Sequence, residues 1–152
     1  MRVEKSVVID ASREDVWELI GDPCAYPRFM AGLTRVTLKS PDCPVGLGAR
    51  FNVHFRIGSA EVGGLVELVE CDQPADLAWT SVTGIDQRLR WRLRETDDAR
   101  TRVTLRLAWN APGGILGAVS EQVSKPMVAS TLDQSLHNLK AELEGGPDEV
   151  SE

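Results

Sequence analysis

The chain has 152 residues, of which 42% are hydrophobic and 26% are charged. This length and composition suit one globular domain that buries a core without disulfide or metal support. The net charge of −6 does not supply the broad positive field on which non-specific nucleic-acid binding depends, so we expect no nucleic-acid partner.

The cysteines and the opening segment bear on location. Cys24, Cys43 and Cys71 are an odd number without a Cys-x-x-Cys pair, unlike secreted disulfide frameworks and zinc sites. We therefore expect reduced thiols. The opening "MRVEKSVVID" lacks the apolar run of a signal peptide, and no later stretch approaches a transmembrane span. The cytoplasm is the expected location.

The first residues predict a strand followed by two short helices. "VEKSVVI" is typical of a strand, and Ser12 and Asp15 form a capping-box-like start to the helix "SREDVWELI". Gly21 suits a left-handed exit from this helix, and Pro23 cannot continue it. A second short helix is expected to begin near Pro27.

Six stretches with the period of a strand follow, and their short connections favour an antiparallel sheet over helical crossovers. Several alternate between apolar and polar residues, which is typical of strands with one buried face. Gly63 and Gly64 suggest a bulge or a sharp bend in one of them. The stretches are "LTRVTLKS", "ARFNVHFRI", "EVGGLVELVE", "DLAWTSVT", "QRLRWRLRE" and "RVTLRLAW".

In "QRLRWRLRE", arginines occupy one phase of the period and apolar residues occupy the other. We interpret the arginines as the solvent face of a strand, near acidic side chains such as Glu61, Glu67 and Glu70 on neighbouring strands if the register allows. A role in binding an anion or nucleic acid is the less favoured alternative. The face that carries Trp91 then points to the interior.

The inward phases of the strands form a face rich in large side chains, which includes three of the four tryptophans. Such a face needs a cover, and a helical pattern from about Gly113 to Glu144 is the only long candidate. Pro126 is expected to kink or break that helix. The inward residues are Phe51, Phe55, Val66, Leu68, Trp79, Ser81, Leu89, Trp91, Leu93, Leu105, Leu107 and Trp109.

The final helical pattern carries two apolar lines that are displaced around its axis. The first line is Leu116, Val119, Val123 and Met127, and its continuation is polar: Ser130, Thr131, Gln134 and Asn138. The second line is Val128, Leu132, Leu136, Leu139 and Leu143. The pattern is compatible with a kinked core helix, or with a helix whose turns from Val123 to Gln134 roof a cavity.

Few titratable groups fall on the inward phase. His54 shares the outward phase of its strand, and His137 lies beyond the expected roof. With two histidines and no clustered carboxylates, we expect no metal site and no cofactor. Tyr26 is the strongest candidate for a reactive role and Ser81 the next, although the sequence shows no activating partner for either.

The order of strand, helix, short helix, six strands and long helix resembles the helix-grip fold of the SRPBCC or START-like superfamily of polyketide cyclases, dehydrases and lipid-transport proteins. "VVIDASREDVWELIGDPCAYPRFM" is similar to the family's opening, in which I-D-A-x-x-x-x-V-W precedes D-P-x-x-Y-P. "PVGLGARFNV" and "VELVECDQPADLAWTSV" resemble its third-strand entry and its meeting of two strands at a proline turn. The resemblance covers Arg2 to Glu144. It implies an α+β fold in which a curved antiparallel sheet of about seven strands wraps around a long C-terminal helix.

The resemblance also implies a deep hydrophobic cavity, so we expect the chain to bind or carry a small hydrophobic ligand such as a lipid or polyketide. One alternative is a cyclase-, aromatase- or dehydratase-like enzyme using Tyr26 and Ser81; another is a protein-interaction domain with a filled core. Aromatase/cyclase members carry polar residues, including an arginine, on inner strands, where this chain has Val66 and Leu68. The expected ligand-binding residues are Tyr26, Phe29, Phe51, Phe55, Trp79, Ser81, Trp91, Trp109, Val123, Met127, Thr131 and Gln134.

The domain boundaries follow from composition. A single domain is expected over residues 1–144, and the glycine, proline and acidic residues of 145–152 predict a flexible tail. The expected partner is the small hydrophobic ligand, without stable membrane insertion.

Overall fold

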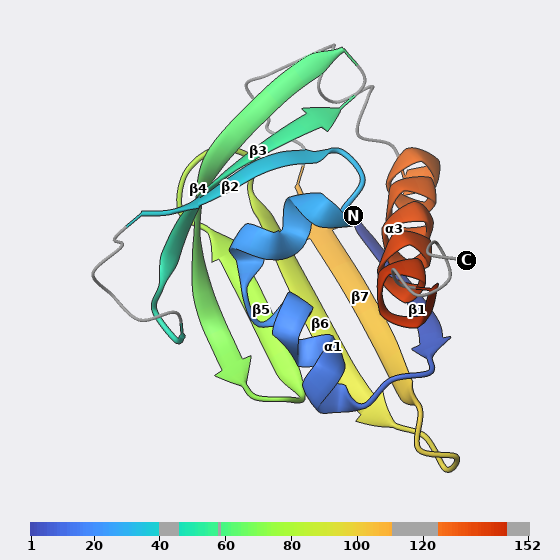
Figure 1. Ribbon diagram of the computed structural model, residues 1–152. Coiled ribbons are helices and arrows are strands. Elements are labelled where there is room, and N and C mark those ends of the chain that lie inside the picture. The colour runs from blue at the N-terminus through green and yellow to red at the C-terminus, as the bar shows by residue number, and fades with distance from the viewer. Residues whose placement is uncertain (40–45, 58, 111–124, 146–152) are drawn as a thin grey trace.

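The computed structural model describes residues 1–39, 46–57, 59–110 and 125–145, which are arranged as Figure 1 shows. The strand β1 (Arg2–Ile9) precedes the helix α1 (Arg13–Ile20) and the 3-10 helix η1 (Pro23–Arg28). Six strands follow: β2 (Leu33–Leu38), β3 (Arg50–Ile57), β4 (Ala60–Asp72), β5 (Asp76–Ser81), β6 (Gln87–Glu95) and β7 (Thr101–Trp109). The helix α3 (Lys125–Lys140) and the π-helical turn η2 (Ala141–Gly145) complete the described chain.

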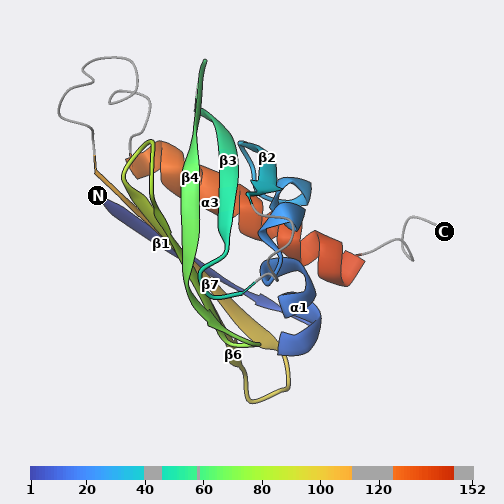
Figure 2. The same ribbon diagram turned by 90° about the vertical axis from the view of Figure 1, so that its left-hand side faces the viewer.

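All the strands belong to one sheet of seven, in the order β1-β7-β6-β5-β4-β3-β2. Every neighbouring pair is antiparallel. The sheet is curved, and α1, η1 and α3 lie on the same side of it (Figures 1 and 2). The expected α+β architecture is therefore confirmed, including the two short helices after the first strand and the C-terminal helix against the sheet. The second short helix begins at Pro23, where Asp22 caps it, and the predicted start near Pro27 is wrong.

The start of α1 follows the sequence prediction, but its end differs. The amide of Asp15 donates a hydrogen bond to Ser12 Oγ at 3.1 Å, as expected of a capping residue. Gly21 is right-handed, with φ −73°, so the predicted left-handed exit is wrong. The indole of Trp17 lies over this residue, and a Cβ at Gly21 would meet Trp17 Nε1 at 2.4 Å. Glycine is needed here for space, whereas its conformational freedom is not used.

Of the bulge or sharp bend that the sequence suggests at Gly63 and Gly64, the bulge is absent from the pairing of β3 with β4. The pairing of β3 with β4 runs through both glycines without a shift, with Val53 opposite Gly64. The irregularity lies farther along β4, between Leu68 and Glu70, in the pairing with β5. It has no glycine signal in the sequence.

Gly64 has a different role, which is to let another part of the chain come close. A Cβ at Gly64 would lie 2.4 Å from the carbonyl oxygen of Thr83, in the connection between β5 and β6. Gly84, next along that connection, has φ +85°, a left-handed conformation that favours glycine. The connection and β4 therefore pack backbone against backbone.

The two faces of the sheet are assigned as the sequence predicts. Trp79, Trp91 and Trp109 are all buried, with 1%, 0% and 4% of their surface exposed. In β6 the alternate residues Arg88, Arg92 and Arg94 are exposed, while Arg90 is half-buried. The arginines of β6 are thus on the outer face, away from the helices.

Two of these arginines bind carboxylates on β4 and β5. Arg90 pairs with Glu70 at 2.8 Å, reaching across the small side chain of Ala78 on the strand between them. Arg94 pairs with Asp76 of β5 at 3.0 Å. The other two predicted acidic neighbours pair with β3 instead: Glu61 binds Arg56, and Glu67 binds Arg50.

The helix α3 presents its second apolar line to the core, as predicted. Val128, Leu132, Leu136 and Leu139 are buried, and Leu143 packs partly buried against the same core. On the same side, Lys5 of β1 pairs with Asp133 of α3 at 3.4 Å.

The structure describes this helix from Lys125 onward. Because residues 111–124 are not among the described ones, the expected kink or break at Pro126 stays a prediction. After Pro126 the helix continues to Lys140 without another proline. The first apolar line before Met127, including Val123, lies outside the described residues, as does the predicted tail from 146 onward.

Candidate functional site

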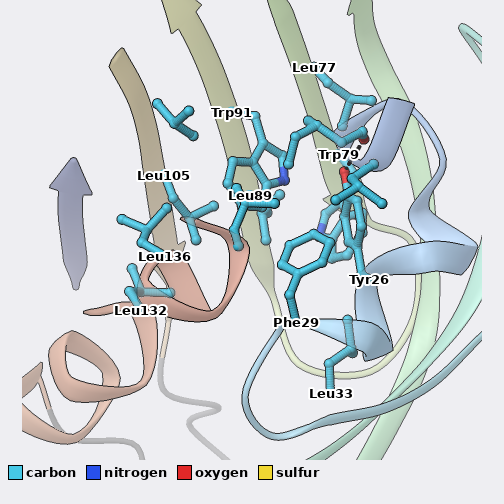
Figure 3. Close-up of a cluster of buried hydrophobic side chains, with 14 of the residues drawn as sticks. Tyr26, Phe29, Leu33, Leu77, Trp79, Leu89, Trp91, Leu105, Leu132 and Leu136 are labelled. Carbon is cyan, nitrogen blue, oxygen red and sulfur yellow. Dashed lines mark hydrogen bonds between the residues drawn. The ribbon is translucent and has the colours of Figure 1, made fainter. Parts of the chain in front are cut away.

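An aromatic cluster fills the core near η1, as Figure 3 shows. The ring centre of Tyr26 lies 5.6 Å from that of Phe29, 5.7 Å from that of Trp79 and 5.9 Å from that of Trp91. Phe29 and Trp91 are 6.1 Å apart with nearly perpendicular rings. These separations are those of rings in direct contact. The inner face is therefore closely packed at this end of the molecule.

The hydroxyl of Tyr26 is engaged within this cluster. It is fully buried and donates a hydrogen bond of 2.6 Å to the carbonyl oxygen of Ile20, at the end of α1. Burial raises the pKa of Tyr26 well above its ordinary value, because the phenolate would lose its solvation. The side chain thus ties η1 to α1 and keeps its proton.

Tyr26 should resist ionisation until the protein unfolds. As the pH rises above about 10, the unfolded chain loses the phenolic proton first, so the folded state loses stability in that range. Tyr26 is the only tyrosine, so phenolate absorbance reports it alone. We expect phenolate absorbance to appear together with unfolding. As the pH rises above about 10, the melting temperature of the Tyr26→Phe variant should fall less than that of the unsubstituted protein. Phenolate formation in the native protein near pH 10 would contradict this prediction.

A pocket of about 200 Å³ opens at the other end of the core, beside the first turns of α3. Its walls come from the inner sides of β3, β6 and β7, the segment after η1, and α3. The lining residues are Ala31, Gly32, Phe55, Arg56, Ile85, Gln87, Leu107, Trp109, Met127, Val128, Thr131 and Leu132. Most of this lining is apolar.

Hydrogen bonds to α3 hold the segment after η1 in place along this pocket. The amide of Ala31 donates to Ser135 Oγ at 2.9 Å, and Asn138 Nδ2 donates to the carbonyl oxygen of Phe29 at 3.1 Å. Gly32 has φ +83°, which turns the chain into β2. Part of the polar line of α3 therefore positions the backbone that forms one wall.

Trp109 and Gln87 both bring hydrogen-bond donors to the pocket lining. The indole N–H of Trp109 is buried and has no acceptor among the residues that the structure describes. Gln87 Oε1 accepts the indole N–H of Trp79 at 3.0 Å, which fixes the amide and leaves its NH₂ group as a donor. The indole N–H of Trp91 interacts with the hydroxyl group of Tyr26, and Trp91 does not line this pocket. An acceptor on a bound molecule would satisfy the N–H of Trp109.

Four of the predicted ligand-binding residues line the pocket: Phe55, Trp109, Met127 and Thr131. Five others lie in the packed core and do not line the pocket: Tyr26, Phe29, Phe51, Trp79 and Trp91. Ser81 Oγ accepts a hydrogen bond from the amide of Gln87 at 3.1 Å, so it supports the strand that carries a lining residue. Gln134 is exposed and donates to Asn138 Oδ1 at 2.8 Å. Val123 is not among the described residues, and the ligand-binding and reactive roles of the whole set stay predictions.

Sequence reasoning missed several lining residues, of which Gln87 is the most informative. It is only 7% exposed and begins β6 in the same phase as Leu89 and Trp91. A polar residue at an inward position of a strand was therefore a readable signal. Ala31, Gly32 and Ile85 carry no comparable signal, because they lie in connections whose path the periodicity does not predict.

The structure of the described residues also bears on metal binding and on membrane insertion. Its His, Cys, Asp and Glu side chains form no group of three or more that could hold a metal ion. None of its helices is both long enough and apolar enough to span a bilayer.

Comparisons with known proteins agree with this architecture. The structure matches a START superfamily protein from Mycobacterium smegmatis with a TM-score of 0.76 and 15% sequence identity, covering 95% of this chain and 97% of that one. An aromatase/cyclase from a Streptomyces species, Zhui, matches with a TM-score of 0.70 and 19% identity, covering 95% and 93%. A Thermus thermophilus protein matches with a TM-score of 0.78 and 17% identity, covering 95% and 98%. These likenesses show the fold.

No curated protein matches the chain by sequence. A family model does match: the model of polyketide cyclase / dehydrase and lipid transport proteins covers residues 1–144. Because the match spans nearly the whole chain and the fold agrees with it, the chain belongs to the polyketide cyclase / dehydrase and lipid transport family.

Proposed function

We propose that the chain binds a small, largely apolar molecule that carries a hydrogen-bond acceptor, in the pocket between the sheet and α3. The observation that carries this proposal is the N–H of Trp109, which is buried in an apolar lining without an acceptor among the described residues. A buried donor without a partner costs free energy, which an acceptor on the ligand would restore. The NH₂ group of Gln87 offers a second donor in the same lining.

The size of the pocket favours a compact ligand. An apolar cavity of about 150 Å³ is enough to bind benzene, and this pocket measures about 200 Å³. A molecule of one ring with a short polar substituent therefore fits the described walls. A lipid or polyketide would place one end here, with its carbonyl or carboxylate oxygen toward Trp109.

The lining favours binding or carriage over catalysis. Arg56 is its only ionisable residue among the described ones, and this side chain is exposed and pairs with Glu61. Acid–base chemistry needs a titratable group within reach of the ligand, whereas Tyr26 and Ser81 make hydrogen bonds elsewhere in the protein. The described cysteines, Cys24 and Cys71, are both free, which supports the cytoplasm as the proposed location.

A matched pair of ligands tests the proposal. Acetophenone and ethylbenzene have nearly the same shape, but only acetophenone carries an acceptor. We expect both to bind in an NMR titration, and acetophenone to bind more tightly. Trp109→Phe keeps a ring but removes the N–H. It should therefore lower the affinity for acetophenone by about 2- to 10-fold and leave the affinity for ethylbenzene nearly unchanged.

Trp17→Phe is the control, because Trp17 lies in α1 and does not line the pocket. It should leave both affinities unchanged. If neither ligand binds, the better interpretation is that the chain is a protein-interaction domain whose core is filled. If acetophenone shows no advantage, the acceptor part of the proposal is wrong. Turnover of a poly-β-ketone mimic that is lost in Tyr26→Phe would favour the enzyme instead.

A further inference from the structure

The outer face of the sheet carries a concentration of arginine. This face lies on the side of the sheet away from α1 and α3 (Figure 2), and arginine is the only basic residue type at the outward positions of β1, β6 and β7. Arg90 and Arg94 pair with carboxylates, whereas the others have no ion pair among the described residues. The outward arginines are Arg2, Arg88, Arg90, Arg92, Arg94, Arg102 and Arg106.

The register brings some of these like charges together. Arg90 lies directly opposite Arg106, and Arg94 lies directly opposite Arg102, across the β6–β7 pairing. Like charges at directly opposed positions destabilise a sheet. Glu4 lies opposite Arg106 on β1, but the two form no ion pair. In a chain of net charge −6, such a local cost indicates a function for this face.

Part of this face is hollowed. A depression of about 580 Å³ is bordered by Arg2, Arg88, Arg90 and Arg106, and its lining also includes Val69 and the small side chains of Ala78 and Ala108. Ala108 is the register partner of both Arg2 and Arg88. Strands are about 4.8 Å apart, so the backbones of these two arginines are roughly 10 Å apart with only a methyl group between them.

The charge in this hollow is not balanced from within. Glu70 is its only acidic lining residue, and Glu70 Oε1 already accepts hydrogen bonds from Arg90 Nε at 3.1 Å and Arg90 Nη2 at 2.8 Å. Arg2, Arg88 and Arg106 are left with no carboxylate partner among the residues described. Three positive charges without a carboxylate partner therefore border this hollow.

We propose that this hollow is a binding site for a phosphate group, held by Arg2, Arg88 and Arg106. The guanidinium fork matches the oxygens of phosphate, and a terminal phosphate has enough oxygens to accept from several arginines at once. The confined hollow and the acidic charge of the chain as a whole suit a single phosphate-bearing group rather than a long polyanion. The site is on the opposite face of the sheet from the apolar pocket and does not depend on it.

Pyrophosphate is the probe for this site, titrated calorimetrically at low ionic strength. We expect saturable binding to the full chain that weakens as salt is added. Arg88→Gln and Arg106→Gln should each lower the affinity by at least about tenfold, since each removes charge-assisted hydrogen bonds. Both variants should fold, and Arg106→Gln should keep or raise the melting temperature because it relieves the repulsion with Arg90.

Arg35→Gln is the matched control: it removes the same charge from β2, where Arg35 is exposed and has no ion pair among the described residues. It should leave pyrophosphate binding unchanged. The proposal is overturned if pyrophosphate does not bind, or if all three variants weaken it equally.

A second experiment distinguishes a lipid headgroup from a soluble phosphate ester. It measures co-sedimentation of the protein with phosphatidylcholine vesicles that contain or lack phosphatidic acid. Binding to the vesicles with phosphatidic acid that is lost in Arg88→Gln supports a lipid headgroup as the occupant. Pyrophosphate binding without vesicle binding supports a soluble phosphate ester. Vesicle binding that is unaffected by Arg88→Gln and Arg106→Gln would count against this site.

Discussion

Alanine in place of Trp91 is expected to lower the free energy of unfolding by about 3–5 kcal/mol, the range for removing a large aromatic side chain from a core. Trp91 is completely buried and touches the rings of Tyr26 and Phe29. Its loss would leave a cavity at the centre of the aromatic cluster that joins η1 to the sheet. Urea unfolding followed by circular dichroism measures the effect.

The matched control for this prediction is the neighbouring outward residue. Arg92→Ala should change the free energy of unfolding by no more than about 0.5 kcal/mol, because Arg92 is exposed and has no ion pair among the described residues. Arg90→Ala should cost somewhat more, up to about 1 kcal/mol, since its pair with Glu70 is only partly exposed. Equal losses for Trp91→Ala and Arg92→Ala would mean that the two faces of β6 are assigned the wrong way round.

Gly64→Ala is expected to be strongly destabilising for a small substitution. The added methyl group would lie 2.4 Å from the carbonyl oxygen of Thr83. The backbones that carry the two groups are held in place by the sheet and by its connection, so neither can easily move away. We expect a loss of about 1–3 kcal/mol or more, as for other overpacked sites. Gly84→Ala should be similar, because its Cβ would meet the carbonyl oxygen of Gly63 at 2.5 Å in a left-handed conformation.

Gly46→Ala is the control that separates the steric clash at Gly64 from the effect of replacing any glycine with alanine. A Cβ at Gly46 has no atom within 4 Å and its φ is not in the left-handed range, so the substitution should be nearly neutral. The comparison uses unfolding midpoints in urea for the three variants. If Gly64→Ala unfolds at the same urea concentration as Gly46→Ala, the close approach of the two backbones is not present in solution.

The faces of the sheet could be predicted from the sequence because alternation is a local property. Each residue of β6 or β7 has its side set by its parity within the strand, so the inward tryptophans and outward arginines follow without knowledge of the fold. The capping of α1 by Ser12 was equally local. The apolar line of α3 from Val128 to Leu139 follows from the helical period in the same way.

The position of the pocket could not be predicted, because inward orientation does not distinguish a filled region from a hollow one. Trp91 and Trp109 both point inward, yet Trp91 is packed among rings from η1 while Trp109 lines the pocket. That difference depends on where η1 and α3 come to lie, which involves contacts between distant segments. The role of Gly64 was missed for the same reason. Gly64 lies in β4, and Thr83, which approaches it in space, lies in the connection between β5 and β6.

The pair formed by Lys5 and Asp133 has a consequence for how the protein behaves at high concentration. β1 has a neighbouring strand on one side only, and unpaired strand margins invite further chains to add by hydrogen bonding and to aggregate. Lys5 directs an ammonium group toward α3 from this margin, and a charge in that position discourages an incoming strand, which would have to bury it. The ion pair that joins β1 to α3 therefore also disfavours self-association through the edge of the sheet.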